Sequence, residues 1–267
     1  MNHYDEIILN HYQNVAQEDR DSHLSTMKDA YIRERETSLI LQFVNDYISN
    51  VGDLNGIVIA DIGCGNGYTL SVLSSEFPNL KFIGYEYTPE LRQVAIDRFK
   101  NNNNVEIKAA DIRNEFSDIK HDLCIVQRVI INLLDIDHQS IAVENVCSTL
   151  KKNGNILFIE SFKNGLDELN EARSEFELPE IKSAYHNLLL NDDFFQWTKE
   201  LSGCKISNYE SNFLSSYYYI ARVLHPHLLG DIKFKRNSHF VKYMSQNITL
   251  DYGNYSPIQA YAFTSQK

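Results

Sequence analysis

Short apolar runs alternate with amphipathic stretches along the middle of the chain, between residues 56 and 162. The apolar runs are rich in β-branched residues and too short for most helices, so we expect strands buried on both faces. They lie at residues 57–62, 81–87, 105–110, 122–127 and 156–160. Helical periodicity predicts helices at residues 68–76, 89–100 and 138–150, and residues 152–154 are expected to form the turn after the last one. This alternation predicts a parallel sheet covered by helices on both faces.

The two flanks show a different pattern, dominated by helical spacing. Residues 26–48 are expected to form one helix, and residues 166–176 and 192–201 two more. Residues 205–213 and 258–264 are expected to be strands. The aromatic run at 215–224 fits a strand or a serine-capped helix, and we favour the helix because 258–264 is the better last strand. We therefore divide the chain into a helical cap segment at 1–50, a core at 51–162, and cap helices with last strands at 163–267.

Composition and charge exclude several classes of protein. The 267 residues are 43% hydrophobic and 23% charged, as in ordinary globular proteins. A net charge of −11 argues against nucleic acid as a partner. There is no apolar run of membrane-spanning length, and residues 1–10 carry Asp5 and Glu6 where a signal peptide would be basic. We therefore expect a cytoplasmic protein without membrane insertion, and nothing in the sequence predicts its oligomeric state.

The cysteines and histidines do not predict a metal site. The four cysteines lie far apart, without a C-x-x-C pair or a nearby histidine at zinc-binding spacing. We interpret them as reduced, mostly buried thiols. The pair His225 and His227 is separated by Pro226, which favours a loop over a pair of metal ligands.

The strongest chemical signal is a glycine-rich turn that follows the first buried strand. Residues 58–67 read VIADIGCGNG, so that Gly63, Gly65 and Gly67 follow Asp61 at the transition from strand to helix. Glycines at such a turn let the backbone approach a ligand, and the next helix offers free N–H groups. The G-x-G-x-G spacing differs from the G-x-G-x-x-G of dinucleotide-binding proteins. An acid two residues earlier would also repel a pyrophosphate, which counts against NAD or FAD.

This arrangement resembles the class I S-adenosylmethionine-dependent methyltransferases, over about residues 40–162. Their first motif is an acid followed by G-x-G-x-G, and later motifs follow here in the family's order. The resemblance implies a Rossmann-like, doubly wound sheet of about seven strands, mostly parallel with an antiparallel last strand, plus helical cap insertions. It implies S-adenosylmethionine as cofactor, and Glu86 as the acid that binds its ribose. The implied binding residues are Asp61, Gly63, Cys64, Gly65, Gly67, Glu86, Tyr87, Asp111, Ile112, Gln127 and Arg128.

Two features of the sequence depart from patterns found in this family. Asn153 stands where a second glycine or a proline pair is more usual, in a turn remote from the cofactor. After the fourth strand the chain reads QRVI, without a D/N-P-P-Y/F motif. The missing motif argues against methylation of amino groups in adenine, cytosine or glutamine. It also leaves open an alternative hypothesis, a catalytically silent subunit that binds the cofactor.

The acceptor side of the site is predicted from isolated residues only. Arg33 is a candidate partner of the cofactor's carboxylate, although a solvated helix face explains it equally well. His186 is a candidate general base, although a structural histidine is the commoner case. Candidate substrate-binding residues are Asn132, Tyr217, Tyr218 and Arg222. The flanks diffusely resemble methyltransferases of bacterial surface-polysaccharide biosynthesis, so we expect O-methylation of a small anionic acceptor such as a sugar, a nucleotide-activated sugar or a phosphate-type group.

Overall fold

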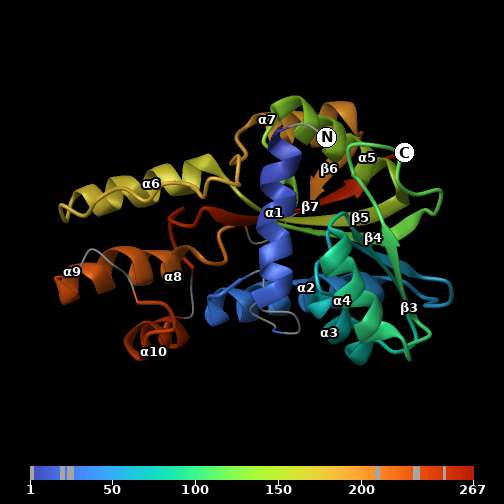
Figure 1. The fold of residues 1–267 in the computed structure, drawn as a ribbon, viewed down its shortest axis with the longest axis horizontal. Coiled ribbons are helices and arrows are strands. Elements are labelled where there is room, and N and C mark those ends of the chain that lie inside the picture. Colours follow the sequence, from blue (N-terminus) through green and yellow to red (C-terminus); the bar gives the residue numbers. More distant parts are fainter. Residues whose placement is uncertain (1–2, 19–21, 23–26, 208–210, 231–234, 249–250) are drawn as a thin grey trace.

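A single seven-stranded sheet runs through the middle of the computed structural model (Figure 1). The structure describes residues 3–18, 22, 27–207, 211–230, 235–248 and 251–267. The strands are β1 (Val58–Ile62), β2 (Lys81–Glu86), β3 (Val105–Ala109), β4 (His121–Gln127), β5 (Leu150–Ser161), β6 (Cys204–Ser207) and β7 (Ile258–Ser265). Their order across the sheet is β3-β2-β1-β4-β5-β7-β6. The strands from β3 to β5 pair in parallel, and β7 is antiparallel to both of its neighbours. The predicted fold class is confirmed.

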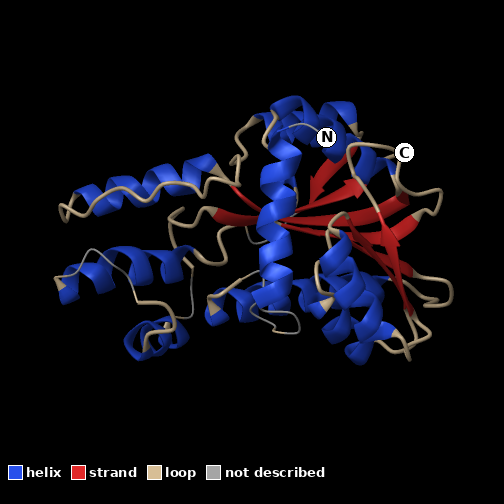
Figure 2. Cartoon of the chain, viewed as in Figure 1, coloured by secondary structure: helices blue, strands red, loops and turns tan. Residues whose placement is uncertain are grey.

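Helices cover both faces of this sheet, and several further helices extend to one side of it (Figure 2). The helices are α1 (His3–Glu18), α2 (Ala30–Asn50), α3 (Tyr68–Glu76), α4 (Pro89–Phe99), α5 (Ile136–Ser148), α6 (Lys163–Ser174), α7 (Asp193–Gln196), α8 (Ser215–Tyr219), α9 (His225–Leu229) and α10 (His239–Asn247). Short helical turns are η1 (Ile130–Asn132), η2 (Trp197–Leu201) and η3 (Ile220–Leu224). In Figure 1, α2 and α3 lie on one side of the sheet and α5 and α7 on the other, while α1 crosses in front of the strands and α6, α8, α9 and α10 extend to the left.

The alternation of side chains along each strand divides the core into two layers. In β4, Leu123 and Ile125 pack with the residues of α2 and α3, whereas Cys124 and Val126 pack with those of α5. All four of these side chains are fully buried. Both faces of the strand are therefore apolar, which explains its unbroken hydrophobic sequence.

Several predicted elements differ from the observed ones. Residues 152–154 do not form a separate turn, because β5 already begins at Leu150, and Asn153, with a φ of 60°, lies where its pairing with β4 changes register. The predicted strand at 205–213 is described only as β6, with 208–210 outside the described residues. Residue 26, where the N-terminal helix was expected to begin, is also outside them. The histidine-proline loop is instead α9, because a proline fits the first turn of a helix.

The aromatic segment forms α8 and η3, as the sequence favoured. The helix α1 was not predicted. Among its described side chains only Ala16 is buried, so α1 contributes little to the core. Within the described ranges, none of the helices has both the length and the apolar character that crossing a bilayer requires.

Candidate active site

A pocket opens where the strand order reverses, beside the carboxyl ends of β1 and β4. From β1 the chain continues outward to β2 on one side, whereas β4 continues to β5 on the other. Loops therefore leave these two neighbouring strands in opposite directions, and α/β sheets bind ligands in the crevice this produces. The pocket encloses about 1230 Å³ of empty space, including solvent at its mouth. The predicted site residues in its lining are Arg33, Asp61, Gly63, Cys64, Gly65, Glu86, Tyr87, Asp111, Ile112, Gln127, Arg128 and Asn132.

The glycine turn after β1 requires backbone angles that other residues rarely adopt. Gly63, Gly65 and Gly67 have φ values of 72°, 55° and 77°. A Cβ on Gly63 would lie 2.4 Å from the Val129 side chain, and one on Gly67 would lie 2.7 Å from Phe99. Gly67 is not part of the pocket lining, so the structure gives it a packing role at the start of α3, beside α4. Gly63 and Gly65 keep the floor of the pocket open.

Two buried acids lie beside this turn. Glu86 at the end of β2 accepts hydrogen bonds from the backbone N–H of Gly65 at 2.9 Å and of Thr88 at 2.7 Å. Burial nevertheless raises its pKa. Asp61 is 2% exposed, and its Oδ2 has no hydrogen-bond partner among the described residues. Burial and the neighbouring charge of Glu86 raise the pKa of Asp61 to about 7. A buried acid of this kind calls for a donor or a cation that a ligand can supply.

At the other end of the pocket, an arginine joins the loop after β3 to α1. Arg113 donates from Nε and Nη2 to Asp111, with a shortest distance of 2.7 Å, and from Nη1 to Asp5 of α1 at 2.6 Å. Its guanidinium carbon lies 5.7 Å from the centre of the Tyr87 ring. Although burial acts in the opposite direction, the hydrogen bonds from Arg113 lower the pKa of Asp111. This contact holds α1 against the strand ends.

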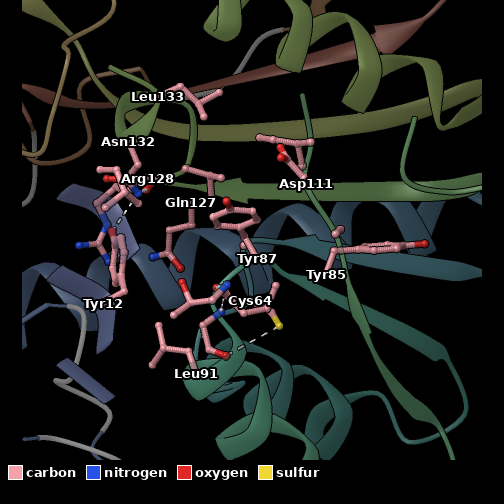
Figure 3. A pocket seen from close by; sticks show the side chains of 18 of the residues that line it. Tyr12, Cys64, Tyr85, Tyr87, Leu91, Asp111, Gln127, Arg128, Asn132 and Leu133 are labelled. Carbon is pink, nitrogen blue, oxygen red and sulfur yellow. Dashed lines mark hydrogen bonds between the residues drawn. The ribbon is translucent and has the colours of Figure 1, made fainter. Parts of the chain in front are cut away.

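The side chain of Gln127 lies between the turn at Cys64 and Arg128 (Figure 3). Its Oε1 accepts from Thr69 Oγ1 at 3.3 Å and from Arg33 Nη1 at 3.5 Å. Arg128 is itself in the left-handed region, with a φ of 55°. The next three backbone N–H groups, from Val129 to Ile131, point at the buried carboxylate of Glu160. Burial raises the pKa of Glu160 to about 7 against these bonds. The sequence analysis missed Glu160, which fixes the loop after β4.

The helix α1 supplies residues of the pocket that the sequence analysis also missed. Tyr4, Ile8 and Tyr12 follow one another at intervals of four residues and line the pocket together with Asp5. Tyr12 Oη accepts a hydrogen bond from Asn132 Nδ2 at 2.8 Å, and burial raises its pKa to about 12. Figure 3 shows Tyr12, Asn132 and Arg128 on one side of the pocket and Asp111 on the other. The spacing of four residues between Tyr4, Ile8 and Tyr12 is typical of one face of a helix, but no sequence motif marks these residues as part of a site.

The structure places the remaining predicted residues outside the pocket lining. Tyr217 donates to Asp29 Oδ2 at 2.6 Å, and Arg222 pairs with the same carboxylate at 3.3 Å. Tyr218 lies beside Arg222, with 5.4 Å between the guanidinium carbon and the ring centre. Because Asp29 caps α2, this buried cluster joins α8 and η3 to the start of that helix. The structure therefore gives these three residues a packing role instead of contact with the pocket.

His186 also lies outside the lining. Its ring stacks on that of His11 in α1, with the two centres 3.8 Å apart. Burial, with the charge of His11, lowers the pKa of His186 to about 4, so the imidazole is neutral at pH 7. The structure places His186 against His11 of α1 and outside the pocket lining, so no contact with the pocket among the described residues supports the general-base role that the sequence suggested.

Comparison with known proteins identifies the family. A family model described as a methyltransferase domain matches residues 53–202, which is more than half of the chain. Over 67 residues the chain is 36% identical to malonyl-(acyl-carrier protein) O-methyltransferase of Acetivibrio thermocellus, a match covering 25% of this chain and 23% of that protein. Over 104 residues it is 32% identical to indole glucosinolate O-methyltransferase 5 of Arabidopsis thaliana, covering 39% and 26% respectively. The matches thus span about a quarter of each curated relative.

A solved structure extends the likeness to the whole fold. The N-methyltransferase NodS of Bradyrhizobium japonicum WM9, in complex with S-adenosylhomocysteine, superposes with a TM-score of 0.58. It is 14% identical and covers 96% of this chain and 98% of its own. At this identity the comparison shows a shared fold. Together with the family match, it shows that the chain belongs to the methyltransferase domain family, as a class I S-adenosylmethionine-dependent member.

Proposed function

We propose that this protein transfers a methyl group from S-adenosylmethionine to a small acceptor, most readily to an oxygen atom. The observation that carries the proposal is the buried carboxylate of Asp61, whose Oδ2 finds no donor among the described residues, at the switch point of the sheet. The cofactor carries the groups that this pocket needs, namely a cationic amino group, two ribose hydroxyls and a flat aromatic purine ring. These groups fit the acids on one side and the apolar lining on the other.

Different residues of the pocket would bind different parts of the cofactor. Glu86 would accept hydrogen bonds from the ribose hydroxyls, and Asp61 would face the amino end. Arg33, which is 5% exposed, would bind the carboxylate. The side chains of Ile112, Leu133 and Tyr87 offer apolar surface for the purine. Bound there, S-adenosylmethionine would supply an electrophilic methyl group on a sulfonium sulfur.

The protein's own part in the reaction is to hold the two partners in line and to exclude water. The helix α1 serves the second purpose, because Tyr4, Ile8 and Tyr12 close one side of the pocket. Tyr12 and Asn132, which share a hydrogen bond, lie on the same side of the pocket as Arg128. We assign Tyr12, Asn132 and Arg128 to the acceptor end of the pocket.

The names of the curated relatives support oxygen as the accepting atom, because both are O-methyltransferases. The proposal of an anionic acceptor, such as a sugar, a nucleotide-activated sugar or a phosphate-type group, now depends on Arg128, because we assign Arg33 to the cofactor's carboxylate. Arg222 no longer supports it, because it forms a buried pair with Asp29. Arg128 lines the pocket on the same side as Asn132, so an acidic acceptor stays the one we favour.

A panel of paired acceptors tests the proposal through the release of S-adenosylhomocysteine. Each pair would consist of a hydroxyl compound and its amino analogue, in neutral and in phosphorylated or carboxylated form. We expect turnover with a hydroxyl compound of the acidic set. Turnover only with amines would contradict O-methylation. Tight binding of S-adenosylhomocysteine without turnover on any acceptor or crude metabolite extract would favour the silent cofactor-binding subunit.

A further inference from the structure

A buried acid on α2 contacts the loop after β4 from behind the pocket. Glu36 is fully buried, with 0% of its surface exposed. Its Oε2 accepts a hydrogen bond from Gln127 Nε2 at 2.8 Å, and its Oε1 lies 3.3 Å from Arg128 Nε. Glu36 does not line the pocket, whereas both of its partners do. Its carboxylate is therefore held by two residues that face the ligand.

The sequence of α2 places this acid on the same face as Arg33. Positions three apart on a helix are neighbours, so Arg33 and Glu36 both point at the sheet. Asp29 begins the helix by accepting from the backbone N–H of Ile32, which fixes where these side chains lie. Glu34 lies between them in sequence but is exposed. Burying a carboxylate is costly unless it is paired, and the partners of Glu36 are two residues that line the pocket.

Glu36 determines the orientation of the Gln127 amide. An ionised carboxylate can only accept, so the amide must turn Nε2 toward it. Gln127 Oε1 then faces the opposite way, where Thr69 and Arg33 donate to it. Both lone pairs of Oε1 are then occupied by these two donors, so the oriented amide helps to hold the Arg33 guanidinium in place. Arg33 is the residue that we assign to the carboxylate at the amino-acid end of the cofactor.

Glu36 also balances the charge of the strained residue Arg128. The backbone of a non-glycine residue with a φ of 55° is strained, and its surroundings must offset that cost. The ion pair with Glu36 supplies one such contact. Burial and the charge of Arg128 both lower the pKa of Arg33, whereas Glu36 raises it. Without Glu36, the repulsion between the two guanidinium groups in the pocket would no longer be offset by this carboxylate.

We infer that Glu36 is a positioning residue that acts through Gln127 and Arg128 to shape the subsite for the amino-acid end of the cofactor. This inference rests on the proposed function. It concerns one end of the ligand only, because Glu36 has no contact with Glu86 or with the loop after β3 among the hydrogen bonds and ion pairs of the described residues.

Two ligands that differ at that end test the inference by calorimetry. S-adenosylhomocysteine carries the amino-acid group, and 5′-methylthioadenosine lacks it. We expect Glu36→Gln to weaken binding of S-adenosylhomocysteine about tenfold, as for one charged hydrogen bond, and to change binding of 5′-methylthioadenosine less than twofold. The matched control is Glu34→Gln, which removes the same charge from an exposed position of the same helix and should alter neither affinity.

Equal weakening of both ligands, or no weakening of either, would overturn the inference. If Glu36→Gln fails to fold, Glu36→Asp keeps the charge at a shorter reach and should still weaken only S-adenosylhomocysteine, by a smaller factor. Equal affinities of that variant and the wild type for S-adenosylhomocysteine would likewise contradict the role. A wild-type protein that binds neither ligand would instead refute the proposed function, so the two failures are distinguishable.

Discussion

Replacing Asp61 by asparagine should stabilise the unliganded protein while weakening its affinity for the cofactor. The side chain is buried, and its pKa rises from 3.8 to about 7 through burial and the nearby Glu86. A rise of this size corresponds to about 4 kcal/mol at a pH above both values. Asparagine keeps the shape of aspartate without the charge. We therefore expect Asp61→Asn to raise the free energy of unfolding at pH 8 by about 2 to 4 kcal/mol.

The stabilisation by Asp61→Asn should depend on pH. An acid whose pKa is raised in the folded state binds more protons folded than unfolded, so its contribution to stability falls as pH rises from about 4 to about 7. The stability difference between variant and wild type should thus be small at pH 4 and largest above pH 7. Thermal unfolding without ligand measures it, with an expected gain in Tm of about 4 to 12 °C at pH 8.

Calorimetry with S-adenosylhomocysteine supplies the second half of this test. Loss of the charge should weaken binding about tenfold or more, because a charged hydrogen bond is worth about 1.5 to 3 kcal/mol. Stability and affinity should therefore change in opposite directions. An Asp61→Asn protein that is less stable than the wild type at pH 8, or that binds the ligand unchanged, would refute the reasoning.

Three further substitutions test other parts of the pocket. Gly65→Val should abolish measurable binding of S-adenosylhomocysteine, because a branched side chain at a φ of 55° strains the turn and fills the pocket floor. If calorimetry gives the same affinity for this variant as for the wild type, the cofactor binds elsewhere. Asp5→Asn breaks the ion pair of α1 with Arg113 and should speed ligand dissociation about fivefold in stopped-flow traces, whereas an unchanged rate would separate α1 from ligand retention. His186→Asn should change turnover less than about threefold, given its stacking outside the pocket, and a hundredfold loss would establish it as the base.

The sequence predicted which residues meet at the switch point of the sheet, because their positions follow from local rules. The turn with Gly63 and Gly65 and the acids Asp61 and Glu86 lie at ends of strands, and parallel strands bring their carboxyl ends to one edge. The order and the parallel direction of the strands are enough to bring the glycine turn and the two acids together. The resemblance to a known family supplied the roles, and the structure places the residues in one pocket.

The acceptor end could not be predicted in the same way, because it is built by contacts distant in sequence. Tyr12 meets Asn132 at this end, and Asp5 meets Arg113 at the opposite end of the pocket. Both contacts depend on where α1 lies against the sheet, which no spacing within the helix predicts. Arg222 looked like a site residue, but it is buried against Asp29, a partner 193 positions away. No spacing rule distinguishes a buried arginine that binds a ligand from one that pairs with a cap residue.

Titration of S-adenosylhomocysteine into the wild-type protein by calorimetry tests whether the pocket binds this cofactor. We expect one ligand bound per chain, with a dissociation constant well below about 1 mM, the weak end of ordinary enzyme affinities. We also expect that NAD does not compete, because Asp61 and the spacing of the glycines disfavour a pyrophosphate. Absence of binding up to about a millimolar ligand, or displacement by NAD, would show that the pocket is not a site for S-adenosylmethionine.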